Sequence, residues 1–182
     1  MGYTIVGAAA ALLVMWGISI QRRLAGMDEN VNHAMSQIGV QLSSCFDALT
    51  VLLDLTKGYA AHESQAMIET IRSHRSEITA ASTPQDVLKL EGVISEALGR
   101  IQVVAEQYPD LKTNEKYTRY MNAVDSYEKM VRTSRLIYND SVTRLNRELR
   151  MFPTFLLAGV FGFHRREYLE AAEGSVPDYE TD

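Results

Sequence analysis

Charged side chains are absent from the first 21 residues of this 182-residue sequence, and Arg22 and Arg23 follow at once. The absence matters because ~20 apolar residues of helix, at ~1.5 Å per residue, cover the ~30 Å hydrocarbon layer of a bilayer. Residues 3–20 are nearly all apolar or small, so the sequence predicts a membrane-spanning helix. The side chains expected to anchor it are Tyr3, Ile5, Val6, Leu12, Leu13, Val14, Trp16, Ile18 and Ile20.

A cleaved secretory signal is the alternative for this segment, but two of its features are missing. No Lys or Arg precedes Arg22, and the small residues 7–11 come before the bulky residues 12–16, whereas a cleavage site needs the reverse order. We therefore favour an uncleaved anchor. Basic residues flank spans on the cytoplasmic side, so Arg22 and Arg23 predict an outward N-terminus and residues 22–182 in the cytoplasm.

Cysteine and net basic charge are also scarce. The one cysteine, Cys45, excludes an internal disulfide framework and suits a reducing compartment. The formal net charge is −5, and residues 173–182 supply most of it, so the rest of the chain is close to neutral. We expect no nucleic-acid partner, because nucleic acid requires a basic face. Composition predicts three parts: an anchor at 1–21, a bundle domain at 22–172 and a disordered acidic tail at 173–182.

No stretch alternates between apolar and polar residues for long enough to form a sheet, whereas apolar residues recur at helical spacing. In three segments they step by three and four, the a/d pattern of helices packed as in a coiled coil. We predict an all-α fold, with an antiparallel up-and-down bundle of three to four long helices after the transmembrane helix. The predicted seams are Val31, Met35, Ile38, Leu42, Cys45, Leu49 and Leu52, then Val87, Leu90, Ile94, Ala97, Ile101, Val104 and Tyr108, then Tyr117, Tyr120, Val124, Tyr127, Val131, Ser134, Tyr138, Leu145 and Leu149.

Local chemistry sets the expected helix ends. Thr83 can cap a helix that starts at Pro84, because proline suits the first helical position. Pro109 should end that helix, since the residue before a proline avoids helical geometry. Thr113 or Asn114 can cap the helix after it.

Gly58 lies inside the first periodic segment, where glycine costs about 1 kcal/mol relative to alanine. We favour a tolerated glycine over a break, so that the first helix continues to about Ala81. Three long helices would then place residues 152–170 far from the bilayer. A break near Gly58 would add a helix and return those residues to it.

Motifs that would support catalysis are incomplete. His62-Glu63 begins like a zinc-protease helix, but the second histidine that this signature needs is replaced by Ala66. Ser126 and Lys129 have the spacing of a catalytic dyad, which is also that of ordinary neighbours on a helix, and no glycine-rich loop stands nearby. We expect no enzyme activity, no cofactor and no metal site.

Tyrosines are frequent in the third segment, and we favour a place in the core over a partner surface for their rings. Asn139, beside Tyr138, is expected to cap or bridge the C-terminal loop.

Residues 152–163 are uncharged and mostly bulky, but too few to span a bilayer as a helix. We favour a lid over the end or side of the bundle. The alternative is a contact surface for another subunit or for the membrane interface, with Arg165 and Arg166 near phosphates. Small residues four apart in the anchor would also let two such helices approach closely. The candidates for self-association are Gly7, Ala11, Phe152, Phe155, Leu156, Val160, Phe161 and Phe163.

Three stretches form a distinctive combination. The first comprises Gln41-Leu42, Asp47, Leu52 and Lys57 to Glu63; the second is Tyr108 to Lys112; the third comprises Ile137 to Asp140, Val142, Phe152-Pro153, Ala158 to Phe163 and Tyr168 to Glu170. In order and spacing, over roughly residues 30–170, they resemble the LemA family of bacterial membrane-anchored proteins. The family usually has a basic pair and an Ile-Pro-Asn step in its first helix, where this chain has Ser44, Cys45, Leu49, Thr50 and Val51.

The resemblance implies a membrane-tethered helical bundle of the bacterial inner membrane with an outward N-terminus, and it implies no particular activity. Some relatives are associated with specialised membranes such as those around magnetosomes, which favours a scaffolding role. We therefore expect a non-catalytic scaffold that contacts membrane lipid and forms homo-oligomers. The alternative is an adaptor or sensor for a membrane protein such as a protease or kinase.

Overall fold

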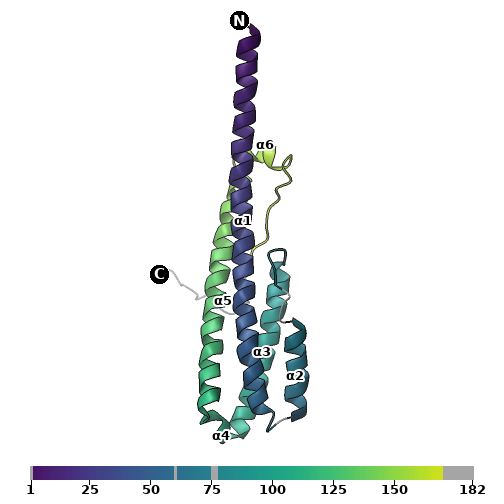
Figure 1. Ribbon diagram of the computed structural model, residues 1–182, viewed down its shortest axis with the longest axis vertical. Helices are drawn as coiled ribbons and strands as arrows, with labels where there is room; N and C mark the ends of the chain where they lie inside the picture. The colour runs from purple at the N-terminus through teal and green to yellow at the C-terminus, as the bar shows by residue number, and fades with distance from the viewer. Residues whose placement is uncertain (1, 60, 75–77, 170–182) are drawn as a thin grey trace, which may run out of the picture.

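The computed structural model describes residues 2–59, 61–74 and 78–169, except for the side chains of residues 61–64 and 74. All regular structure in these ranges is helical, and the chain forms a rod along one very long helix (Figure 1). The helices are α1 (Gly2–Thr56), α2 (Ala61–His74), α3 (Pro84–Gln107), α4 (Pro109–Lys112), α5 (Glu115–Glu148) and α6 (Thr154–Ala158).

The rod has a bare end and a packed end. From the N-terminus, α1 runs alone and then enters the packed part, where α2 and α3 lie beside its C-terminal half (Figure 1). The short α4 turns the chain at the far end, and α5 returns along α1 as its main packing partner. After α6, the chain runs back along α1 and α5 in extended form (Figure 1).

The predicted apolar seams form the core. Every seam residue from Val31 to Leu52 is buried, and so is every one from Val87 to Val104. The prediction for Tyr108, the last residue of the second seam, is wrong, because α3 ends before it and its side chain is exposed. In the third seam Tyr120 and Tyr127 are only partly buried, while Tyr117 and Tyr138 are buried as expected for core tyrosines. Burial of these side chains is the main favourable contribution to folding, at about 25 cal/mol per Å² of apolar surface.

The prediction that Gly58 is tolerated inside one helix to Ala81 is wrong. The chain leaves α1 after Thr56 and turns at residues 57–59, and α2 packs back against α1 with Met67, Ile68 and Ile71 buried. The reason is that continuing the helix would leave the apolar face of α2 without a partner, whereas the hairpin buries it. The added helix brings residues 152–163 back beside the part of α1 that adjoins the predicted span (Figure 1).

The capping predictions are confirmed. The Thr83 side chain accepts from the Asp86 backbone N–H at 3.3 Å, and Asp86 Oδ2 accepts from the Thr83 backbone N–H at 2.8 Å. Asn114, one of the two candidates for the next cap, accepts from the Lys116 N–H at 2.9 Å. These bonds satisfy amide groups that have no partner in the first turn of a helix.

Cys45 lies in the packed core rather than at a reactive site. Burial, together with the nearby Glu128 carboxylate, raises the pKa of its thiol from 9.0 to about 12. The thiolate is the reactive form, so Cys45 is inert at neutral pH while the core stays closed.

Candidate functional site at the base of the stalk

Residues 3–20 of α1, here called the stalk, project from the bundle, and only their last turns, from Trp16 to Ile20, lie against another element. These residues are exposed except for Gly17 and Ile20, which are partly covered, and Leu24 is the first buried residue of α1. In the described part of the chain, α1 is the one helix long and apolar enough to cross a membrane, and its apolar window is not buried. An exposed apolar helix of this length is a candidate membrane span.

Residues 152–163, here called the foot, lie against the base of the stalk. A shallow pocket of about 310 Å³ brings Trp16, Ser19 and Ile20 of α1 together with Phe152 and Pro153 of the foot. Trp16 lies about one helical turn before Ile20, so the foot stands at the level where the apolar stalk ends.

The foot is attached on one side and exposed on the other. Thr154 and Ala158 are buried and Phe163 packs partly against the core. In contrast, Phe152 and Val160 are each 78% exposed. Phe155, Leu156 and Phe161 are also exposed. The foot therefore covers part of the bundle, as the lid interpretation expected, but it also presents the apolar surface expected of a contact site.

A buried carboxylate fastens the foot to α1. Arg23 lies 3.0 Å from the Oε2 atom of Glu148, whose side chain is only 11% exposed. The hydroxyl of Thr154, in the first turn of α6, donates to the other oxygen of Glu148 at 3.3 Å. A buried carboxylate is costly unless it is paired, so this cluster fixes α1, α5 and α6 in one arrangement.

Residues 164–169, here called the latch, are held by two asparagine side chains of α5. Asn146 donates to the Arg166 carbonyl at 2.9 Å and accepts from the Arg166 N–H at 3.0 Å. Asn139 makes the same pair of bonds with Leu169, each at 2.9 Å. The two residues are seven apart and so lie on one face of α5. Each side-chain amide bonds an extended backbone as a neighbouring β-strand would.

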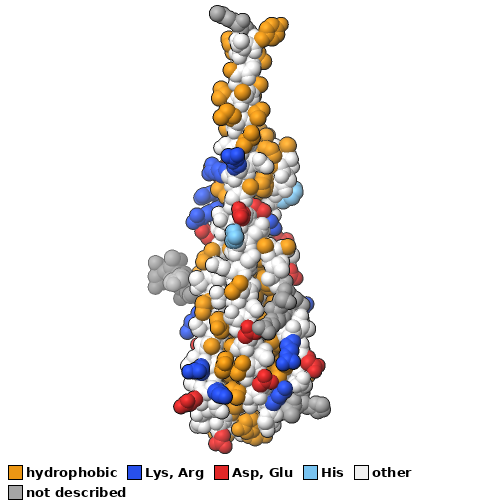
Figure 2. Space-filling model, in the orientation of Figure 1, with side chains coloured by type: hydrophobic (Ala, Val, Ile, Leu, Met, Phe, Trp, Pro, Cys, Tyr) orange, Lys and Arg blue, Asp and Glu red, His pale blue; other side chains and the backbone are white. Residues whose placement is uncertain are grey.

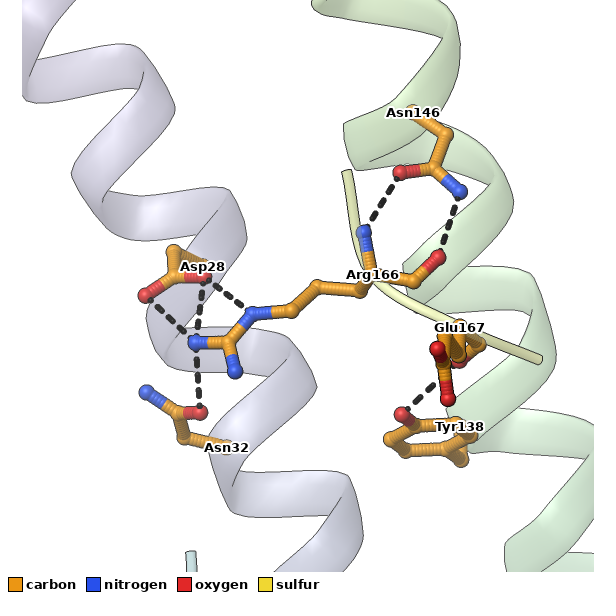
Figure 3. Close-up of polar contacts among 6 residues, drawn as sticks. All are labelled: Asp28, Asn32, Tyr138, Asn146, Arg166 and Glu167. Carbon is orange, nitrogen blue, oxygen red and sulfur yellow. Dashed lines mark hydrogen bonds and ion pairs between the residues drawn. The ribbon is translucent and has the colours of Figure 1, made fainter. Parts of the chain in front are cut away.

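The latch also reaches α1. The Arg166 guanidinium donates to Asp28 Oδ1 from Nε at 3.0 Å and from Nη2 at 2.9 Å, and to Asn32 at 3.3 Å (Figure 3). Arg166 therefore has a carboxylate partner within the chain, and its place near phosphates in the alternative interpretation stays a prediction. Charge-assisted forked bonds of this kind are stronger than neutral ones and fix orientation.

Tyr138 of α5 also holds the latch. Its hydroxyl donates to the Glu167 carbonyl at 3.0 Å (Figure 3). Burial raises the pKa of this phenol, and the Glu167 carboxylate adds to the rise while Arg166 opposes it. Tyr138 therefore remains a neutral donor throughout the physiological range. The bonds of Asn139 to Leu169 match the predicted bridge from Asn139 to the C-terminal loop, and Tyr138 adds a further contact.

Arginines surround the foot. Arg22 precedes the packed part of α1, Arg147 and Arg150 precede the foot, and Arg165 follows it, and all four are exposed. Figure 2 shows Lys and Arg side chains gathered just below the bare stalk, next to the apolar bulge. Arg23 differs from these four because it is paired with Glu148, whereas Arg22 remains at the surface.

The incomplete catalytic and metal motifs of the sequence form no reactive centre in the residues that the structure describes. Lys129 lies 3.6 Å from Asp125, in an exposed pair one helical turn apart. Groups of three or more His, Cys, Asp or Glu that could hold a metal are absent from the described residues. The side chains of His62 and Glu63, and the predicted tail at 173–182, lie outside what the structure describes.

Sequence reasoning identified Asn139 but missed Asn146 and Asp28. A usable signal existed for Asn146, because it interrupts the buried face formed by Val142, Leu145 and Leu149. Asp28 gave no signal, since its partner Arg166 is 138 positions away.

The sequence was compared with models of known families and with known proteins, and both comparisons found matches. The family model described as LemA family matches residues 34–179. Magnetosome proteins MamQ 1 and MamQ 2 of Paramagnetospirillum magneticum are each 34% identical to this chain over 92 residues, and MamQ of Magnetospirillum gryphiswaldense is 30% identical over the same length. The aligned part covers 50% of this chain and 34% of each relative, so the match spans about a third of the length of these curated relatives.

Proposed function

The chain belongs to the LemA family, and we propose that it is a single-pass membrane protein without catalytic activity that acts as a self-associating scaffold. The stalk is the observation that carries this proposal. It is an apolar helix continuous with the core helix of the rod, so the bilayer position of the stalk fixes that of the whole bundle. The similarity to proteins named for the magnetosome supports a role at a specialised membrane.

The proposed orientation has the N-terminus outside and the rod in the cytoplasm of a bacterial inner membrane. Arg22 and Arg23 support it, because they follow the stalk directly and basic residues flank membrane spans on the cytoplasmic side. The test is protease treatment of spheroplasts that carry a C-terminal tag. The tag should survive until the membrane is permeabilised, and its digestion from outside would contradict this orientation.

Self-association is proposed to run through the stalk. Gly7 and Ala11 lie on one face of α1, and an added Cβ at Gly7 would meet nothing within 4 Å. Leucines at both positions should therefore leave the single chain intact but block close helix approach. The measurement is particle mass by light scattering in mild detergent. The matched control is Ala9→Leu, on the opposite face of the same helix.

The expected result is an oligomer for the natural chain and for Ala9→Leu, and a smaller species for the Gly7→Leu/Ala11→Leu double variant. A monomer for the natural chain would contradict the scaffold proposal. If the double variant still forms a large oligomer, the contact between copies does not involve this face of the stalk.

The adaptor alternative gains support from one feature, an open groove of about 540 Å³ between α1 and α5. Met27, Ala34 and Ile137 contribute apolar surface, whereas His33 and Arg144 are polar. A photo-crosslinking residue at Ile137 tests it in cells. A reproducible adduct with one other membrane protein would favour the adaptor, and adducts with a second copy of this chain would favour the scaffold.

A further inference from the structure

We propose that the foot is a second membrane contact, which lies in the interfacial layer of the same bilayer that holds the stalk and is surrounded by arginines that favour anionic phospholipid headgroups. The inference needs the membrane anchor of the proposed function but not self-association.

The level of the foot gives the first argument. Phe152 shares a pocket with Trp16 and Ile20, which belong to the last turns of the stalk. If residues 3–20 cross the hydrocarbon layer, Trp16 lies within ~6 Å of its edge, at ~1.5 Å per residue. A group packed beside Trp16 and Ile20 then lies at the boundary between the hydrocarbon layer and the lipid carbonyls. The foot cannot stand clear of the bilayer unless the stalk is pulled out of it.

The surface of the foot gives the second argument. Its exposed side chains are large and apolar, and the Phe152 and Phe155 rings lie 6.4 Å apart, as one small aromatic surface. Exposed apolar side chains grouped this way are unfavourable in water and mark a contact site. Twelve residues are too few to cross the bilayer, so an apolar group of this size fits the boundary layer.

Charge gives the third argument. Two arginines near the foot are paired internally, Arg23 with Glu148 and Arg166 with Asp28. Arg22, Arg147, Arg150 and Arg165, which adjoin the stalk or the foot in the sequence, are exposed. Figure 2 shows Lys and Arg side chains gathered at this end of the bundle, just below the bare stalk. Basic side chains at this level attract anionic headgroups, and the attraction extends only about a Debye length from the surface. An apolar centre with a basic rim is the arrangement that suits an anionic membrane surface.

The polar cluster of Arg23, Glu148 and Thr154 explains how the foot is held in position for a membrane contact. Glu148 bonds both Arg23 and Thr154, so the foot is fixed relative to α1 before it meets lipid. The latch follows immediately and holds the other end of the foot against α5. A rod with two attachment points would keep a defined tilt, which a single flexible tether would not.

The test places a single tryptophan on the foot of the full-length chain in vesicles. In a Trp16→Phe background, Phe155→Trp reports the foot, and Leu136→Trp, exposed on α5 in the middle of the rod, is the matched control. Lipids brominated near the glycerol end of the acyl chains are the quencher. Val160→Trp is a second foot variant in case Phe155→Trp perturbs folding, which circular dichroism will show.

We expect both foot variants to be quenched to an extent comparable with Trp16 of the natural chain, and Leu136→Trp to be unaffected. Quenching should be greater in vesicles with phosphatidylglycerol than in phosphatidylcholine alone, and the excess should fall when Arg147, Arg150 and Arg165 are changed to Gln. Equal quenching in the two lipids would overturn the role assigned to the arginines.

Foot tryptophans that are quenched no more than Leu136→Trp, in vesicles where Trp16 of the natural chain is quenched, would overturn the proposal and leave the anchor intact. Blue-shifted but unquenched foot tryptophans would also overturn it, since they indicate cover by a second copy. Failure of the anchor itself would be distinct, because Trp16 of the natural chain would then also be unquenched.

Discussion

The two ends of the packed rod are held together in different ways. In the distal half, α2, α3 and α5 surround α1, and Leu49, Leu52 and Ile68 are fully buried. In the half next to the stalk, α3 is absent and the latch lies alongside α1 and α5 (Figure 1). There Asn139 and Asn146 bind backbone groups of the latch, and Arg166 crosses to Asp28.

The contrast predicts how each half responds to substitutions that weaken its contacts. Apolar burial is non-directional and tolerates small shifts, and its contribution grows with the area that is removed from water. Hydrogen bonds to an extended segment are directional. Each adds little net stability, but removing one partner leaves the other unsatisfied at a larger cost. The distal half should therefore set the global stability, while the latch should open locally and on its own.

The largest expected effect is in the distal half, where Leu49→Ala should cost about 2–5 kcal/mol because it leaves a cavity in the core. The readout is the reaction of the Cys45 thiol with a maleimide, since the buried thiol reacts only when the core opens. A loss of about 2 kcal/mol should speed labelling about thirtyfold. Val40→Ala, at an exposed position of the same helix, should leave the rate nearly unchanged. Equal rates for the two variants would contradict the assignment of global stability to this core.

How far the sequence predicts this half follows from the same physics. The seam from Val31 to Leu52 repeats every three and four residues, so each local window indicates the buried face. The turn at Gly58 was misjudged because the cost of one glycine is small, about 1 kcal/mol, compared with the packing that decides whether α2 folds back. That packing depends on Ile68 and Ile71, and the pattern around Gly58 does not report it.

Next in size is Asn146→Ala, which removes the partners of the Arg166 N–H and carbonyl groups. Leaving such groups unsatisfied costs about 1–3 kcal/mol each when they stay buried, and less if the latch separates and water replaces them. Hydrogen exchange should show faster exchange at the amides of Arg166 and Leu169, with the distal half unchanged. Asn122→Ala, exposed on the same helix, is the control. An equal rise in the distal half would show that the two halves open together.

The latch was only partly predictable for a physical reason. Residues 164–169 are extended and bond to side chains, so they carry no helical periodicity, and their main ion pair joins positions 138 apart. Asn139 was expected to act at this loop because it lies beside a tyrosine on the buried face. The position of the foot relative to the stalk depends on the number of helices. Because the break near Gly58 is not predicted, the sequence places the foot at the wrong end of the rod.

The smallest expected effect is at the ion pair between Asp28 and Arg166, which is partly exposed and worth roughly 1 kcal/mol. Asp28→Arg should speed exchange at the latch, and the double variant with Arg166→Asp should restore part of the protection. The difference should shrink with added salt, because exposed charges are screened. Glu29→Arg, at the next and exposed position, is the control. A salt-independent effect would indicate that Asp28 acts through packing.

The central claim is that the stalk spans a bilayer and holds the helical bundle at its surface. The most direct test is a spin-label scan of α1 in vesicles, one residue at a time over positions 6–26, in a Cys45→Ala background. If the stalk spans the bilayer, labels should be accessible to oxygen and shielded from a water-soluble nickel chelate through Ile18. The preference for oxygen over the nickel chelate should reverse by Arg22, just after the stalk ends. Labels that the nickel chelate reaches along the whole of positions 6–18 would contradict it.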